Sequence, residues 1–278
     1  MQVNILGACS GLGQKLAGLE LTPDLIRENG FLQILKDSKT KFTDLGNIKP
    51  LSPTDIWPFL GQIKEKVSNH ISKDQIIFNL GGDHSIAIGT IAGTLDKFPE
   101  ARVIWIDAHG DINTPASSVT GNLHGMPLAA ILGLFKTGLT SAFLKKENLI
   151  LIGIRDLDHF EAELLKDLDI VVITAHEITS EPILALNKVT AWLKLKDTPI
   201  HISFDIDSVD PETAPATGLR VAGGLNKEFI FHLVTQIAVT QKVLAIDLVE
   251  LNAKQAKNKA EVDSTLDVFL DILKIFTK

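Results

Sequence analysis

Short apolar runs recur along the whole chain and form its most regular pattern. They are rich in β-branched residues, and most are continuously apolar instead of alternating with polar positions. Such runs are typical of strands that are covered on both faces. The predicted strands are residues 2–6, 76–80, 103–107, 149–154, 170–174, 200–206 and 243–249.

Segments with helical periodicity lie between these strands. Residues 22–35 open with Thr-Pro, a capping residue followed by proline at the first helical position, and residues 226–240 and 260–276 repeat apolar positions at helical spacing. Strand and helix in alternation predict an α/β fold, a three-layer αβα sandwich with a mainly parallel central sheet. No internal repeat or linker divides the chain, so we expect one domain over residues 1–278.

Composition narrows the possible partners. Hydrophobic residues make up 45% and charged residues 22%, as expected for a globular protein with a large core. The 34 acidic and 27 basic residues give a net charge of -7 without a basic cluster, which argues against nucleic acid as a partner. No apolar run approaches the ~18 residues of a membrane span, and no basic leader precedes one, so we expect no membrane partner and a cytoplasmic location.

Sequences rich in glycine, aspartate and histidine follow three of the predicted strands. They read GGDHS after the second, DAHGD from the end of the third and DID at the end of the sixth. Any one of them alone is more typical of a capped turn than of a set of metal ligands. Open α/β sheets bind ligands at the carboxyl ends of their strands, so we expect the three to meet. Because buried carboxylates need cations, the pattern predicts a metal centre.

Spacing and charge define this centre further. Side chains two residues apart in a strand share a face, so Asp107 and His109 converge, as do Asp205 and Asp207, while Asp111 folds back from its loop. Four aspartates balance two divalent cations. Carboxylates with two imidazoles and no thiolate favour manganese over zinc, with cobalt and nickel as alternatives. Two such ions about 3.5 to 4 Å apart make hydroxide available near neutral pH, which predicts hydrolysis.

Four motifs in this order resemble the ureohydrolase family, and among its members most closely the arginases. They are GGDHS, DAHGDIN, GNLHGMPLA and SFDIDSVDP, and the resemblance extends from the opening segment to about Asn252. It implies the arginase-like form of the α/β fold and hydrolysis of L-arginine to L-ornithine and urea by a hydroxide that bridges two Mn²⁺ ions. It also implies one ion bound by His84, Asp107, Asp111 and Asp205, and the other by Asp107, His109, Asp205 and Asp207.

The same resemblance implies which groups react. His124 matches the proton shuttle, and an imidazole that titrates near neutrality suits this task. Glu250 matches the acidic residue that pairs with the guanidinium group, and Asp111 counts among the reacting groups as well as the ligands. As alternatives, His124 would cap the apolar helix that follows it, and Glu250 would be an ordinary exposed glutamate.

The amino acid end of the substrate is assigned in the same way. The resemblance places Asn113, Thr120 and Asn122 at the α-carboxylate, and Asp158 and Glu161 at the α-amino group. The two acids lie one turn apart at the start of a predicted helix, so both carboxylates can face one ammonium. The alternative is that they stabilise the positive end of the helix dipole.

Three departures from the family pattern stand out. Thr120 replaces the usual serine and keeps the hydroxyl, Leu219-Arg220 replaces Thr-Pro and removes a polar group near the predicted metals, and Ala253 replaces a frequent proline. The resemblance further implies a homo-oligomer, a trimer or a hexamer, with a small guanidino compound as substrate.

Three competing functions remain. Another ureohydrolase, such as an agmatinase, would share the metals but act on a substrate without the α-carboxylate. A zinc deacetylase of related architecture would need a catalytic tyrosine, and the sequence contains none. A non-catalytic binding protein is favoured only by the Leu219-Arg220 departure.

Overall fold

A sheet of eight parallel strands runs through the centre of the molecule. The computed structural model describes residues 2–140 and 142–277, and in this part the strand order is β2-β1-β3-β8-β7-β4-β5-β6. Every neighbouring pair is parallel. The strands are β1 Gln2–Ala8, β2 Lys41–Ile48, β3 Gln75–Leu80, β4 Arg102–Ile106, β5 Leu149–Ile154, β6 Val171–Thr174, β7 Ile200–Asp205 and β8 Val243–Val249.

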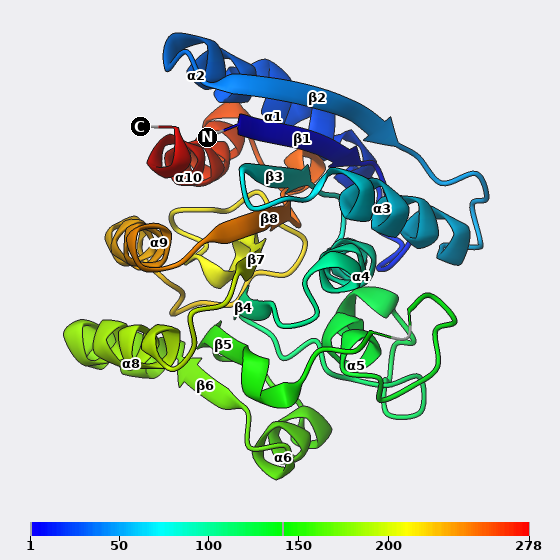
Figure 1. The fold of residues 1–278 in the computed structure, drawn as a ribbon, viewed down its shortest axis with the longest axis vertical. Helices are drawn as coiled ribbons and strands as arrows, with labels where there is room; N and C mark the ends of the chain where they lie inside the picture. The colour runs from blue at the N-terminus through cyan, green and yellow to red at the C-terminus, as the bar shows by residue number, and fades with distance from the viewer. Residues whose placement is uncertain (1, 141, 278) are drawn as a thin grey trace.

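Helices cover both faces of this sheet. Figure 1 shows α8, α9 and α10 on one side and α3, α4 and α5 on the other, which confirms the predicted three-layer αβα sandwich. The helices are α1 Thr22–Ile26, α2 Leu32–Asp37, α3 Trp57–His70, α4 Ala87–Lys97, α5 Pro127–Ile131, α6 His159–Asp167, α7 Ala175–Ser180, α8 Pro182–Lys194, α9 Lys227–Thr240 and α10 Lys259–Phe276.

The seven predicted strands all form, and one further strand, β2, was not predicted. The central strands β4, β5, β7 and β8 are buried along their whole length, as their continuous apolar runs predicted. The missed strand is β2, which pairs only with β1 at the edge of the sheet. Its residues are largely exposed or half-buried, because one side of an edge strand faces solvent, and it therefore lacks an apolar signature.

The single helix predicted over residues 22–35 is wrong. The chain forms α1 and α2 with a wide turn between them at Arg27–Phe31, where Asn29 and Gly30 leave the helical conformation and Gly30 has a φ of 120°. Glycine adopts this left-handed conformation at little cost, so the Asn-Gly pair ends α1. Thr22 is not the cap either, since it lies inside α1 and its hydroxyl donates to the carbonyl of Leu251.

The strand order brings distant segments to one edge of the sheet. The strands β3, β8, β7 and β4 are consecutive neighbours, so the loops after their carboxyl ends lie side by side.

Residues 1 and 278, the ends of the predicted domain, lie outside the described residues, and the single domain stays a prediction. Among the described helices, none combines the length and apolar character that a membrane span requires.

Candidate functional site

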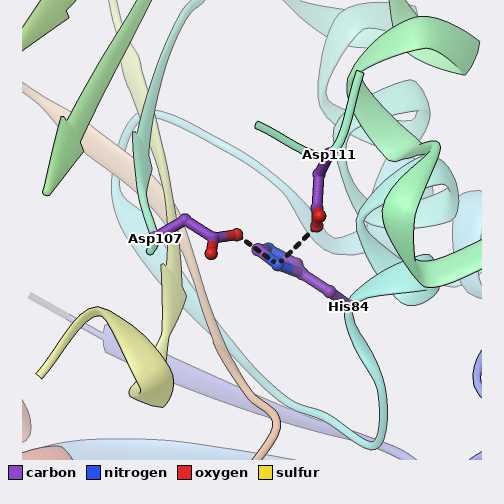
Figure 2. Close-up of side chains that lie close together, drawn as sticks. All are labelled: His84, Asp107 and Asp111. Carbon is purple, nitrogen blue, oxygen red and sulfur yellow. Dashed lines mark ion pairs between the residues drawn. The ribbon is translucent and has the colours of Figure 1, made fainter. Parts of the chain in front are cut away.

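His84 lies at the centre of the carboxylate cluster that the sequence predicted. It follows β3 at the start of a short 3-10 turn and is fully buried. Its Nδ1 atom is 3.0 Å from Asp107 Oδ2, 3.2 Å from Asp111 Oδ2 and 3.1 Å from Asp205 Oδ2. Figure 2 shows the aspartates 107 and 111 converging on the imidazole from the segment after β4.

A second imidazole faces the opposite side of the shared carboxylate. His109 Nδ1 lies 3.3 Å from Asp107 Oδ1 and 3.1 Å from Asp207 Oδ2. Asp107 therefore directs one oxygen at His84 and the other at His109. Two groups with the spacing of metal ligands share this aspartate: His84, Asp107 and Asp111 form one, and Asp107, His109 and Asp207 form the other.

The carboxylates are fixed by donors from their own segments. The backbone N–H of His109 donates to Asp107 Oδ1 at 2.8 Å, and the indole Nε1 of Trp105 donates to Asp107 Oδ2 at 3.0 Å. The backbone N–H of Asp207 donates to Asp205 Oδ1 at 2.8 Å. Asp111 has a φ of 47°, an unfavourable conformation for a non-glycine residue that is common at functional sites. These hydrogen bonds orient Asp107 and Asp205 within the cluster.

The buried imidazole of His84 fits a metal ligand. Its Nδ1 atom makes no hydrogen bond with any described residue, although three carboxylate oxygens lie within 3.2 Å. On the far side of the ring, Nε2 lies 2.9 Å from Ser203 Oγ, which in turn donates to Asp247 Oδ2 at 3.1 Å. Because the Ser203 proton goes to Asp247, its oxygen accepts from Nε2–H, and Nδ1 is the ring atom that faces the carboxylates and would bind a cation.

The charge balance of the cluster also favours cations. Burial and neighbouring carboxylates raise the pKa of Asp205 well above its usual range and that of Asp207 to about 6. Burial alone would lower the pKa of His84, but Asp107, Asp111 and Asp205 outweigh it and raise that pKa well above its usual range. The raised pKa values of carboxylates and imidazole alike indicate that the cluster favours bound positive charge. Divalent cations would supply that charge in place of protons.

An open cavity of about 140 Å³ borders the cluster. It is lined by His109, Asp111, Asn113, His124, Gly125, Glu161, Asp205, Asp207, Leu219 and Glu250. Four of the six predicted ligands thus share a cavity with the predicted reacting groups His124 and Glu250. The cavity next to the buried carboxylate cluster is therefore a candidate binding site for a small molecule.

Glu250 and His124 face each other in this cavity. Glu250 is only 4% exposed, so the alternative of an ordinary exposed glutamate is wrong. Its Oε1 atom lies 3.6 Å from His124 Nδ1. Burial opposes the charged imidazole of His124, but Glu250 outweighs it and raises the pKa of His124 to about 9. His124 therefore carries a proton at neutral pH. It lies in a short 3-10 turn, Leu123–Gly125, ahead of α5, with no side-chain bond that caps α5.

The acids assigned to the α-amino group form a capping box at the start of α6. Asp158 Oδ1 accepts the backbone N–H of Glu161 at 2.9 Å, and Glu161 Oε2 accepts that of Asp158 at 3.2 Å. Glu161 is buried and lines the cavity, and burial together with Asp111 raises its pKa to about 7. Asp158 Oδ2 also accepts the side chain amide of Asn113 at 2.7 Å. Glu161 therefore both caps α6 and lines the cavity, whereas Asp158 caps α6 and binds Asn113.

The remaining predicted substrate-binding residues, Thr120 and Asn122, do not line the cavity. Thr120 is exposed and accepts the backbone N–H of Asn122 at 3.2 Å. At the Leu219-Arg220 departure, Leu219 lines the cavity while the Arg220 guanidinium donates to the carbonyl of Gln255. At the third departure, Ala253 begins a short 3-10 turn whose capping residue is Asn252.

Several residues near the site were not identified from the sequence. Gln14 donates its side chain amide to Glu250, and Asp83 accepts the backbone N–H of Gly13 at 2.8 Å. Behind His84, the fully buried Asp247 lies 3.0 Å from His201 Nε2. The signal for the latter pair was a charged residue inside the apolar run of β8 and a histidine inside that of β7. For Gln14 the sequence carries no local signal.

Known proteins resemble this chain over nearly its whole length. The sequence model of the arginase family matches residues 1–273. Hepatic arginase from Aquarana catesbeiana is 35% identical over 297 residues, which cover 98% of this chain and 91% of the relative.

Solved structures give the same picture. Arginase from Entamoeba histolytica, solved in complex with L-ornithine, is similar with a TM-score of 0.90 at 28% identity, covering 98% of this chain and 97% of that one. Arginase from Bacillus cereus has a TM-score of 0.89 at 31% identity and covers 98% of both chains. These similarities confirm that the αβα fold is of the arginase-like type.

Proposed function

The chain belongs to the arginase family, and we propose that it hydrolyses the guanidino group of L-arginine to give L-ornithine and urea. The family makes it a hydrolase that acts on guanidino groups. The observation that carries the proposal is the convergence of His84 and His109 on Asp107, with Glu250 and His124 in the adjoining cavity. In the similar structure from Entamoeba histolytica, the bound molecule is L-ornithine.

The six predicted ligands would hold two divalent cations, which we propose are Mn²⁺. They are His84, Asp107, His109, Asp111, Asp205 and Asp207. Bound to these residues, two such cations would make hydroxide available as the nucleophile near neutral pH. Oxygen donors with two imidazoles suit manganese, and cobalt or nickel are alternatives.

The chain's own groups bind and orient the substrate and move the proton. Glu250 pairs with the cationic guanidinium, which directs the central carbon toward the carboxylate cluster. Glu161 and Asn113 line the cavity where the amino acid end would lie, and Asp158 accepts the side chain amide of Asn113. We propose that Asp158, Thr120 and Asn122, which do not line the cavity, also contact that end when the substrate is bound. When the bond from carbon to the departing nitrogen breaks, that nitrogen takes the proton of His124, and ornithine and urea are released. Protonated His124 suits this step because its pKa is raised to about 9.

Three further expectations stand as proposals beside this one. We propose that residues 1–278 form one domain, that the protein acts in the cytoplasm, and that it assembles into a trimer or hexamer. Subcellular fractionation and the mass of the assembly in solution test the last two.

L-Arginine should be the preferred substrate. The panel is L-arginine, agmatine, guanidinobutyrate and formiminoglutamate, each assayed with the Mn²⁺-loaded protein by release of urea or formamide. Because the polar groups around the cavity are suited to an amino acid end, kcat/KM for L-arginine should exceed that for agmatine by at least about tenfold. The reverse order would favour the agmatinase alternative and overturn the arginine assignment.

Removal of Asp207 should abolish both activity and metal binding. Asp207 Oδ2 lies 3.1 Å from His109 Nδ1, so Asp207→Ala deletes one side of the second ligand group. Urea release should fall by more than about a hundredfold, and the manganese content after dialysis should drop. Glu212→Ala, an exposed acid five residues farther along, is the matched control and should change neither. Unchanged activity and metal content in Asp207→Ala would refute the metal assignment.

A further inference from the structure

The carboxylate of Glu250 is held by segments that follow three different strands. Its Oε1 atom accepts the backbone N–H of His84 at 2.8 Å and faces His124 Nδ1 at 3.6 Å. Its Oε2 atom accepts the side chain amide of Gln14. Among the described residues, this amide is the one recorded hydrogen-bond donor to Oε2. Glu250 also has a φ of 66°, a conformation that costs a non-glycine residue free energy and persists only when its surroundings enforce it.

The loop that carries Gln14 is fixed on both sides of that residue. This segment, residues 9–18, follows β1 and is called the β1 loop. Gly13 N–H donates to the buried carboxylate of Asp83 at 2.8 Å, and Gly13 O accepts the backbone N–H of His124 at 3.2 Å. Asp83 N–H in turn donates to Ser10 O at 2.9 Å. A Cβ atom at Gly13 would lie 2.2 Å from Asp83 Oδ1, so only glycine allows this approach. The loop therefore delivers the Gln14 amide from a rigid backbone.

The choice of an amide at this position has a chemical consequence. A neutral donor orients a carboxylate without adding a further positive charge to that of the nearby His124. An ammonium or guanidinium side chain in the same place would neutralise Glu250 and compete with a cationic ligand. Gln14 is only partly buried, and it lies 236 residues from Glu250 in the chain, so the contact depends on the fold as a whole.

We propose that Gln14 is a positioning residue for recognition of the guanidinium group: its amide fixes Oε2 of Glu250 so that the carboxylate is presented, still charged, to the cationic end of the substrate. The inference rests on the proposed function. It adds a role in substrate recognition for the β1 loop, a segment that supplies none of the proposed metal ligands.

The test separates the two ends of the substrate. Gln14→Met keeps the length of the side chain and removes the donor, and Gln14→Lys keeps a donor and adds a positive charge. Two inhibitors serve as probes with the Mn²⁺-loaded protein: guanidinium ion carries only the cationic end, and L-norvaline carries only the amino acid end. Lys15→Met, an exposed neighbour in the same loop, is the matched control.

Gln14→Met should weaken inhibition by guanidinium and raise KM for L-arginine by about tenfold, because a hydrogen bond to a charged group is lost. L-Norvaline inhibition should stay within about twofold. Gln14→Lys should weaken guanidinium binding further than Gln14→Met, since the ammonium occupies Glu250. Lys15→Met should match the unmodified protein in all three measurements.

Two results would overturn the proposal. One is an equal loss for both probes, which would mean that the β1 loop merely supports the whole cavity. The other is unchanged guanidinium binding in Gln14→Met. If Gln14→Met does not fold, Gln14→Asn serves instead, because it shortens the side chain by one methylene and moves the amide away from Glu250. It should weaken guanidinium inhibition and leave L-norvaline inhibition unchanged. If the unmodified protein hydrolyses no guanidino compound, the proposed function fails, and calorimetric binding of guanidinium ion to the same variants still decides the role of Gln14.

Discussion

At the scale of single residues, Leu219 is the departure with the clearest chemical consequence. It is 46% exposed, and among the described residues that line the cavity it is the one with an aliphatic side chain. The arginase pattern has Thr-Pro where this chain has Leu219-Arg220. The guanidinium of Arg220 donates to the carbonyl of Gln255 and therefore does not substitute for the missing hydroxyl in the cavity.

A hydroxyl at position 219 should improve catalysis. Leu219→Thr introduces one donor and acceptor beside Asp205 and Asp207, and one neutral hydrogen bond stabilises a complex by about 1 kcal/mol, or about fivefold in kcat/KM. Leu219→Val has the same branched shape without the hydroxyl and isolates its effect. Steady-state hydrolysis of L-arginine measures both variants. Equal changes in the two would show that cavity volume, and not the hydroxyl, matters at this position.

The residues that could be predicted from the sequence are those with a local signature. His84, Asp107 and Asp205 each end or follow an apolar strand, and the geometry brings them together as expected. Gln14 and Asp83 could not be assigned a partner, because their contacts join residues 236 and 70 positions apart. The sequence shows what a residue offers as a ligand or donor, but not which distant group receives it.

At the scale of elements, the strand order explains why these motifs meet. Along the chain, β3 and β4 precede β7 and β8, yet in the sheet β8 and β7 lie between β3 and β4. Apolar runs predicted each of these strands but not their order, which depends on how the crossovers pack. The carboxyl ends of four neighbouring strands therefore supply His84, Glu250, Asp205 and Asp107 in that spatial order.

The errors in the predicted elements also have physical causes. The edge strand β2 buries too little of its surface to carry an apolar pattern, so its position depends on pairing with β1. The predicted helix 22–35 breaks at Asn29 and Gly30, where the Asn29 side chain donates to the carbonyl of Leu25 at 2.8 Å. The prediction rested on the Thr-Pro start and the apolar spacing, neither of which reflects the turn that an Asn-Gly pair favours.

At the scale of the whole molecule, the cluster links pH, metal and stability. In the metal-free protein, the pKa of Asp205 and that of Asp207 are raised by burial, and the folded state keeps protons that the unfolded chain releases above about pH 4. The pKa of His84 is raised by its carboxylates despite burial, so its folded state keeps a proton that the unfolded chain releases above about pH 6.5. All three contributions are present at low pH and are lost as the pH rises.

The stabilisation by Mn²⁺ should therefore grow with pH. The denaturation midpoint of the protein in chelator should fall between pH 5 and pH 8, because Asp207, with a pKa of about 6, and its neighbours lose bound protons and leave buried charge uncompensated. Cations replace these protons, so the rise in midpoint on adding saturating Mn²⁺ should be larger at pH 8 than at pH 5. Thermal denaturation followed by circular dichroism measures both. Asp207→Asn, which has no charge to compensate at either pH, should show a smaller difference between the two values. A Mn²⁺ effect that is equal at both pH values, or larger at pH 5, would mean that the buried carboxylates do not bind the metal.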